Sequence, residues 1–142
     1  MKKITAKLLL RIAAIIMLLH AVGHTLGIVT WQMPNGKIPA DLVQKMQGTH
    51  FLFQGKDATM AAFFSGHGYA GAILLIFIFS LLWVLSGWTD KKSIPILGLV
   101  CISILLLAVD EILYFFPMAV VFSVVAAVLV FIAIQKIKKL YS

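Results

Sequence analysis

Four long apolar segments constrain this chain more than any other feature of its sequence. They run over residues 8–29, 60–87, 94–115 and 117–135, and each comes close to or exceeds the roughly 20 residues that a helix needs to cross a bilayer. Of the 142 residues, 62% are hydrophobic and 12% are charged, whereas about 25% of a typical soluble domain is charged. The sequence therefore predicts an all-α four-helix transmembrane bundle, forming one integral membrane domain over residues 1–142.

Basic residues are concentrated at one set of segment ends and are few at the other. Most of the twelve lysines and arginines lie at ends that would share one side of the membrane, namely Lys2, Lys3, Lys7, Arg11, Lys91, Lys92, Lys136, Lys138 and Lys139. Cytoplasmic loops carry the excess of Lys and Arg, so we expect both termini in the cytoplasm. The net charge of +7 then reflects orientation and contact with lipid headgroups, and we exclude a nucleic-acid partner. The expected location is a cell membrane, the bacterial inner membrane.

The long connection over residues 30–59 would form an extracytoplasmic cap. Residues 33–36 (Met-Pro-Asn-Gly) are typical of a turn, and a short helix would follow from Pro39 to Gln47. We expect this cap to be partly helical and, because it is rich in apolar residues, to lie on the bundle or in the membrane interface. Residues 54–57 (Gln-Gly-Lys-Asp) predict a second turn, with Asp57 as the cap of the next helix.

The first segment contains two histidines, and ionisable groups inside a membrane are costly and commonly functional. His20 and His24 are four residues apart, so they differ by about 40° around the helix axis. Gly23 and Gly27 lie on nearly the same face. Small residues there would let another helix approach closely, which predicts that both histidines face the bundle interior.

Two other segments carry polar groups at a similar depth. His67 and Tyr69 lie among small residues near the start of the second segment, and Asp110 and Glu111 lie near the end of the third. Counted at about 1.5 Å per residue, these groups fall in the outer half of the membrane. We therefore expect a polar site beneath the cap, with the candidate residues His20, His24, His67, Asp110, Glu111, Tyr69 and Tyr114.

Three kinds of chemistry suit such a set. His24 and His67 would ligate the iron of haem b from two helices, or His20 and His24, with His67 or a carboxylate, would hold a divalent metal. A histidine bonded to a carboxylate would instead relay protons or anchor a polar headgroup. A purely structural interpretation stays open beside each: the histidines bridge helices by hydrogen bonds, and the carboxylates are solvated at a helix end.

The sequence predicts no catalytic residue. The serines at positions 65, 80, 86, 103 and 123 are scattered, so we expect no nucleophile–base pair, and the motif of a serine hydrolase is missing. We favour a non-enzymatic function, as a ligand-binding or accessory, scaffolding membrane subunit, with a homo-oligomer or a larger membrane complex as its setting. The alternatives are a haem- or metal-binding redox protein, and a subunit of a small oligomeric transporter.

The order of features resembles a group of uncharacterised small bacterial integral membrane proteins with four predicted helices. The resemblance lies in the His-x2-Gly-His-x2-Gly-like stretch His20–Gly27, the Trp-x2-Pro-like step from Trp31 to Pro34, and the aromatic and glycine stretch Phe64–Gly68. It implies the same four-helix membrane fold over most of the chain. It implies no specific activity.

Overall fold

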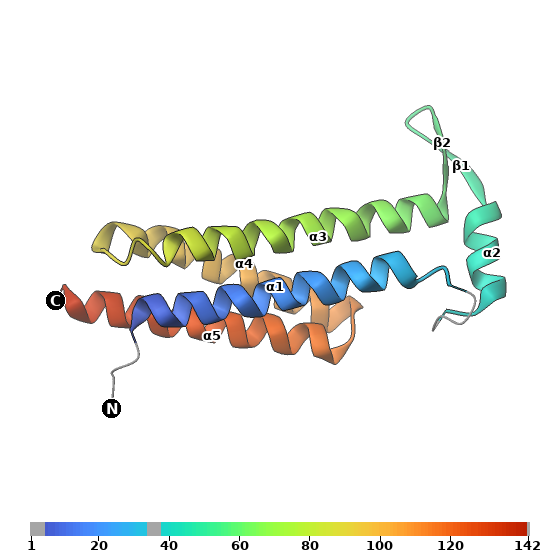
Figure 1. Cartoon of the computed structure of the whole chain (residues 1–142). Helices are drawn as coiled ribbons and strands as arrows, with labels where there is room; N and C mark the ends of the chain where they lie inside the picture. Colours follow the sequence, from blue (N-terminus) through green and yellow to red (C-terminus); the bar gives the residue numbers. More distant parts are fainter. Residues whose placement is uncertain (1–4, 34–37, 142) are drawn as a thin grey trace. The chain divides into compact units, whose positions relative to one another are not determined.

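The computed structural model describes residues 5–33 and 38–141, and most of these residues are helical. In this part of the chain, four helices are long and apolar enough to cross a membrane. They are α1 (Ala6–Thr30), α3 (Met60–Leu85), α4 (Ile94–Tyr114) and α5 (Pro117–Leu140) (Figure 1). The prediction of a mostly helical fold with four candidate membrane spans is confirmed. Lys2, Lys3, Lys37 and the predicted turn beyond Met33 lie outside the described residues.

The ends of the helices follow local signals. The Asp90 carboxylate accepts a hydrogen bond of 3.0 Å from the Ser93 N–H and so caps a 3-10 turn, η1 (Lys91–Ser93), that leads into α4. α5 begins at Pro117, where the missing N–H of proline costs nothing. It continues beyond the predicted end at residue 135, because the lysines there end the apolar span but are themselves good helix formers.

The described residues form two compact units. The first comprises those of Met1–His20 and Leu75–Ser142, and the second is Ala21–Leu74. In the first unit, α4 and α5 are joined through Phe115 and Phe116 and pack against each other. The Sγ of Cys101 on α4 lies 3.5 Å from the carbonyl oxygen of Ala127 on α5, so the two backbones are close.

Small side chains make this close packing possible. Along α5 the buried positions recur every three or four residues and are mostly small, with Ala119, Ser123, Ala126, Ala127, Val130 and Ala133 among them. In lipid, helices associate through van der Waals packing and interhelical hydrogen bonds, since burying apolar surface away from lipid gains little. A small-residue face therefore brings α5 into tight contact with its neighbours in this unit.

The second unit contains the cap predicted over residues 30–59. Its short helix, α2 (Ala40–Gly48), begins directly after Pro39, within a residue of the predicted start. Trp31, Val43 and Ala61 form a small core beneath it. The connection over residues 30–59 thus contains a short helix, and the buried indole of Trp31 anchors it to the start of α3 by donating a hydrogen bond of 3.3 Å to Ser65.

The second turn of the cap is a β-hairpin that the sequence reasoning missed. Strands β1 (His50–Phe53) and β2 (Lys56–Thr59) pair antiparallel, and Gln54 and Gly55 connect them with φ of 49° and 79°. Two successive positive φ values are typical of a type I′ turn, which matches the twist of paired strands. A two-stranded sheet therefore interrupts the predicted all-α pattern.

The predicted helix cap at Asp57 is wrong. Asp57 lies on β2 and pairs with His50, with 2.9 Å between Oδ2 and Nδ1. The cap of α3 is Thr59, whose hydroxyl accepts a hydrogen bond of 3.1 Å from the Ala62 N–H. Once the hairpin pairs Asp57 across the strands, the residue just before the helix takes over the capping role.

The glycines that permit close approach in the second unit are not the predicted ones. A Cβ at Gly23 or Gly27 would meet no described atom within 4 Å. By contrast, a Cβ at Gly68 would lie 2.0 Å from the side chain of Ile28, and one at Gly71 would lie 2.9 Å from His24 Nε2. The small residues that allow α1 and α3 to approach closely therefore belong to α3, and the larger side chains of α1 pack over them.

We expect Gly68→Ala to destabilise the fold by about 1–3 kcal/mol, because the added methyl group collides with Ile28. Gly66→Ala is the matched control on the same helix, where a Cβ meets nothing among the described residues and alanine favours the helix by up to about 1 kcal/mol. Unfolding in detergent micelles, followed by circular dichroism, measures both. Equal stability of the two variants would contradict the close approach at Gly68.

Candidate functional site

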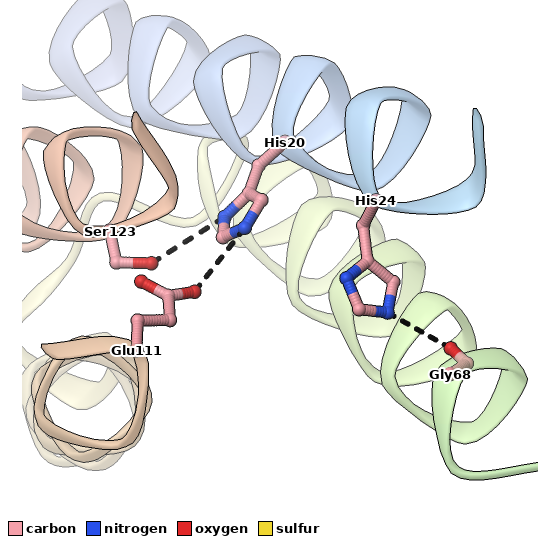
Figure 2. Close-up of polar contacts among 5 residues, drawn as sticks. All are labelled: His20, His24, Gly68, Glu111 and Ser123. Atoms are coloured by element: carbon pink, nitrogen blue, oxygen red, sulfur yellow. Dashed lines mark hydrogen bonds and ion pairs between the residues drawn. The ribbon is translucent and has the colours of Figure 1, made fainter. Parts of the chain in front are cut away.

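The first unit contains a cluster of three buried polar side chains, His20 of α1, Glu111 of α4 and Ser123 of α5, here called the polar cluster (Figure 2). His20 Nε2 lies 3.3 Å from Glu111 Oε1. Its other ring nitrogen, Nδ1, lies 3.5 Å from Ser123 Oγ. The three residues are 5%, 3% and 0% exposed, so the cluster is sealed inside the bundle.

Each member continues the buried stripe of its own helix. His20 follows Ala13 and Met17 at steps of four and three residues, and all three are buried. On α5 the buried stripe includes Ser123. On α4 it ends in Glu111 and consists of Leu97, Val100, Cys101, Ile104, Ala108 and Glu111. Helical periodicity thus directs one polar side chain from each helix to a common point. Phe122 completes the lining by stacking on His20 at 5.7 Å between ring centroids.

The structure separates the two predicted carboxylates. Glu111 is buried, whereas the adjacent Asp110 is exposed, because consecutive residues point about 100° apart on a helix. Tyr114, which is 77% exposed, likewise faces outward. Glu111 lies seven residues after the buried Ile104 and three after the buried Ala108, so it shares their face of α4, and the packing of α4 decides which face is buried.

Ser123 is the member of the cluster that sequence reasoning missed, and the expectation of no nucleophile–base pair is wrong in this respect. The structure aligns a hydroxyl, an imidazole and a carboxylate in the order found in serine hydrolases. The hydroxyl is completely buried, however, and 3.5 Å separates it from the imidazole. A substrate carbonyl could reach Oγ only if the bundle opened, so this arrangement does not make a catalytic site.

The second carboxylate oxygen of Glu111 is unusual. Oε2 is buried and makes no hydrogen bond of normal geometry with any residue of 5–33 and 38–141. In Figure 2 it points toward the Ser123 hydroxyl. Buried polar atoms without a partner are rare and costly, at about 1–3 kcal/mol. The cluster therefore has an acceptor that a small rotation of the Ser123 hydroxyl, or an added proton, would satisfy.

His24 lies in the second unit and holds α1 to α3. Its Nε2 is 3.0 Å from the carbonyl oxygen of Gly68 (Figure 2). A carbonyl can only accept, so Nε2 carries the hydrogen and donates it. The close approach at Gly68 and Gly71 makes this contact possible. The predicted bridging of helices by histidine is what the geometry of His24 supports.

His67 faces an open groove in the same unit. Its Nδ1 donates to the carbonyl oxygen of Phe63 over 2.9 Å, which leaves Nε2 as the nitrogen with the lone pair. The groove has a volume of about 390 Å³ and is lined by Ala58, Ala62, Phe63, Gly66, His67 and Ala70. Tyr69, also predicted as a site residue, is half exposed and is not among these lining residues.

The predicted metal ligands His20, His24 and His67 form no metal-binding group of three in the described part of the chain, and haem ligation by His24 and His67 stays a prediction. No group of three His, Cys, Asp or Glu residues there could hold a metal ion. The Nε2 of His24 is used on Gly68, and both nitrogens of His20 face the polar cluster. A single pocket joining His20 and Glu111 to His24 and His67 would span the two units, and it stays a prediction.

Comparisons with protein-family models, with curated proteins and with solved structures gave no match to this chain. The resemblance to small four-helix bacterial membrane proteins therefore stays a prediction, and the function must be argued from the geometry of the site.

We expect Glu111→Ala to lower the free energy of unfolding by about 1–3 kcal/mol, because buried His20 loses its carboxylate partner. Asp110→Ala removes the neighbouring, exposed carboxylate and should change it by less than about 0.5 kcal/mol. Urea unfolding in mixed micelles provides the comparison. The polar cluster would not contribute to stability if the two variants unfolded alike.

Proposed function

We propose that this chain is a small multi-pass membrane protein that works by binding, as a ligand-binding or accessory subunit, and not by catalysis. The observation that carries the proposal is the His20–Glu111 pair, buried to 6% and 4% side-chain exposure in an otherwise apolar bundle. Well-packed apolar residues in place of a buried ion pair are often equally stable or more stable. Ionisable residues inside membrane helices are functional sites by default, so this pair is where function should be sought.

The closed geometry favours binding over catalysis. Ser123 and Glu111 are buried by the packing of the helices. A substrate therefore has no access to the Ser123 hydroxyl in this conformation. A buried network contributed by α1, α4 and α5 instead makes the packing of three helices depend on one set of hydrogen bonds. Such an element suits a subunit whose conformation responds to a bound ligand or partner.

The proposed orientation has both termini in the cytoplasm of the bacterial inner membrane and the cap outside. Its support is the charge distribution. Lys91 and Lys92 lie between α3 and α4, and Lys136, Lys138 and Lys139 lie in the last turns of α5. Helices that each cross the membrane once would put both groups on the same side as Lys7 and Arg11.

This orientation predicts the labelling of single cysteines. In a Cys101→Ala background, a membrane-impermeant maleimide should label Lys56→Cys in the hairpin on intact cells, because that strand would lie outside. Lys92→Cys between α3 and α4 should react only after the membrane is permeabilised. Both positions are exposed in the structure, so access across the membrane decides the difference. The reverse pattern would invert the proposed topology.

A haem or metal redox protein is the alternative that one observation favours: His67 lines the groove, and its hydrogen bond to Phe63 uses Nδ1 and not Nε2. Against it, the described residues do not supply a set of three metal ligands. A Soret band in the purified protein, lost in His67→Ala, would establish this alternative. No observation favours the oligomeric transporter, which stays a prediction.

Native mass spectrometry of the protein released from lipid nanodiscs tests the binding function. We expect wild type to retain a stoichiometric lipid-like ligand or membrane partner. Glu111→Gln should retain less than about a tenth of it, because we expect the variant to lose about 1.4 kcal/mol or more of binding free energy, which is a tenfold loss of affinity. Asp110→Asn is the matched control and should retain it fully, because Asp110 faces outward. Bare protein in all three samples, or equal retention, would overturn the proposal.

A further inference from the structure

We infer that the polar cluster is a proton-binding site that holds one proton between His20 and Glu111, with Ser123 closing the hydrogen-bond network. This inference rests on the proposed function and specifies its regulation: protonation of the sealed cluster controls the packing of three helices on which binding of the ligand or partner depends. The carrying observations are the two contacts of the imidazole, at 3.3 Å to Glu111 Oε1 and 3.5 Å to Ser123 Oγ, and the buried Oε2 that lacks a partner among the described residues.

With one proton on the pair, every polar atom of the cluster can be satisfied. If the proton is on the imidazole, Nε2 donates to Oε1 and Nδ1 donates to Ser123 Oγ, which leaves the serine hydrogen for Glu111 Oε2. If the proton is on the carboxyl, Oε2 donates to Ser123 Oγ, the serine hydrogen turns to Nδ1, and Nε2 still donates to Oε1. In both cases the three side chains form a closed ring of hydrogen bonds, and the cluster as a whole carries no net charge.

Removing that proton breaks the ring of hydrogen bonds among the three side chains. A carboxylate beside a neutral imidazole has net charge −1, and the serine hydrogen must then serve two acceptors, Nδ1 and Oε2. An uncompensated charge in a site with 3% exposure is costly. Release of the proton therefore weakens the contacts among α1, α4 and α5, from which the three side chains come.

A second proton is equally unfavourable. An imidazolium beside a carboxylic acid has net charge +1, and its Nδ1–H and the Oε2–H must then both donate to Ser123 Oγ. The hydrogen of the serine hydroxyl then has no acceptor within the cluster. The state with one proton is thus the only one that is both uncharged and fully hydrogen-bonded, which makes the site selective for a single proton.

No other ionisable group of the surrounding helices lies where it could hold the proton in place of His20 and Glu111. On α4 the neighbouring Asp110 and Tyr114 point outward. On α1 the ionisable residues nearest in sequence are Arg11, two and a half turns before His20, and His24, one turn after it. α5 has no ionisable residue before Lys136, and α3 has none between Tyr69 and its end at Leu85. Phe122 covers the imidazole with an apolar ring.

The test is a pH titration of the whole protein in lipid nanodiscs with two independent probes. One is the ¹⁵N chemical shift of the His20 side chain, and the other is the infrared carboxyl band of Glu111, assigned by its loss in Glu111→Gln. Because groups coupled this closely titrate as a pair, we expect both signals to change with a common midpoint in wild type. Separate midpoints for the two signals would overturn the inference.

Variants sharpen the test. Glu111→Gln should move the His20 midpoint by more than about one pH unit, since the nearby carboxylate charge is lost. Asp110→Asn, the exposed neighbour, should move it by only a few tenths of a unit. Ser123→Ala should shift the common midpoint, because a hydrogen-bond partner of both groups is lost, while the protein stays folded by circular dichroism. If His20 titrates unchanged in Glu111→Gln, the proton site is refuted, whereas the ligand or partner seen by mass spectrometry would still support the proposed function.

Discussion

The lack of water in the hydrocarbon core of a bilayer is the constraint on which this structure depends. A backbone N–H or C=O without an internal partner costs several kcal/mol there, so each apolar segment must form a continuous helix. α1, α3, α4 and α5 satisfy this requirement over their full lengths. Within residues 5–33 and 38–141, irregular backbone lies between or beyond these helices, and the extended residues of β1 and β2 pair with each other as a hairpin.

The same solvent changes how the helices associate. Lipid tails are as apolar as leucine, so close packing and interhelical hydrogen bonds hold the helices together. Gly68 on α3 serves both purposes in the second unit: it makes room for Ile28, and its carbonyl accepts a hydrogen bond from His24. The small-residue face of α5 has the corresponding role in the first unit, where it brings Ser123 within reach of His20.

The polar cluster acquires its importance from this setting. In water, a histidine and a glutamate 3.3 Å apart would form one of many surface ion pairs of small energy. Sealed among apolar side chains, they must share charge and hydrogen bonds with each other and with Ser123, because no water replaces a lost partner. A single proton then decides whether the cluster is neutral and satisfied. This links the protonation of one site to the packing of three helices.

The apolar segments and their lengths by themselves determined the four helices, because helix formation in lipid depends on local hydrophobicity and backbone bonding alone. They also singled out the histidines and carboxylates as the polar groups of the bundle. Only the tertiary structure decided between Asp110 and Glu111, recruited Ser123, assigned close approach to Gly68 and Gly71 instead of Gly23 and Gly27, and replaced the Asp57 cap by Thr59. Each of these depends on the rotation of one helix against another or on a strand pairing. Such contacts join residues far apart in the chain, and local patterns of hydrophobicity carry no information about them.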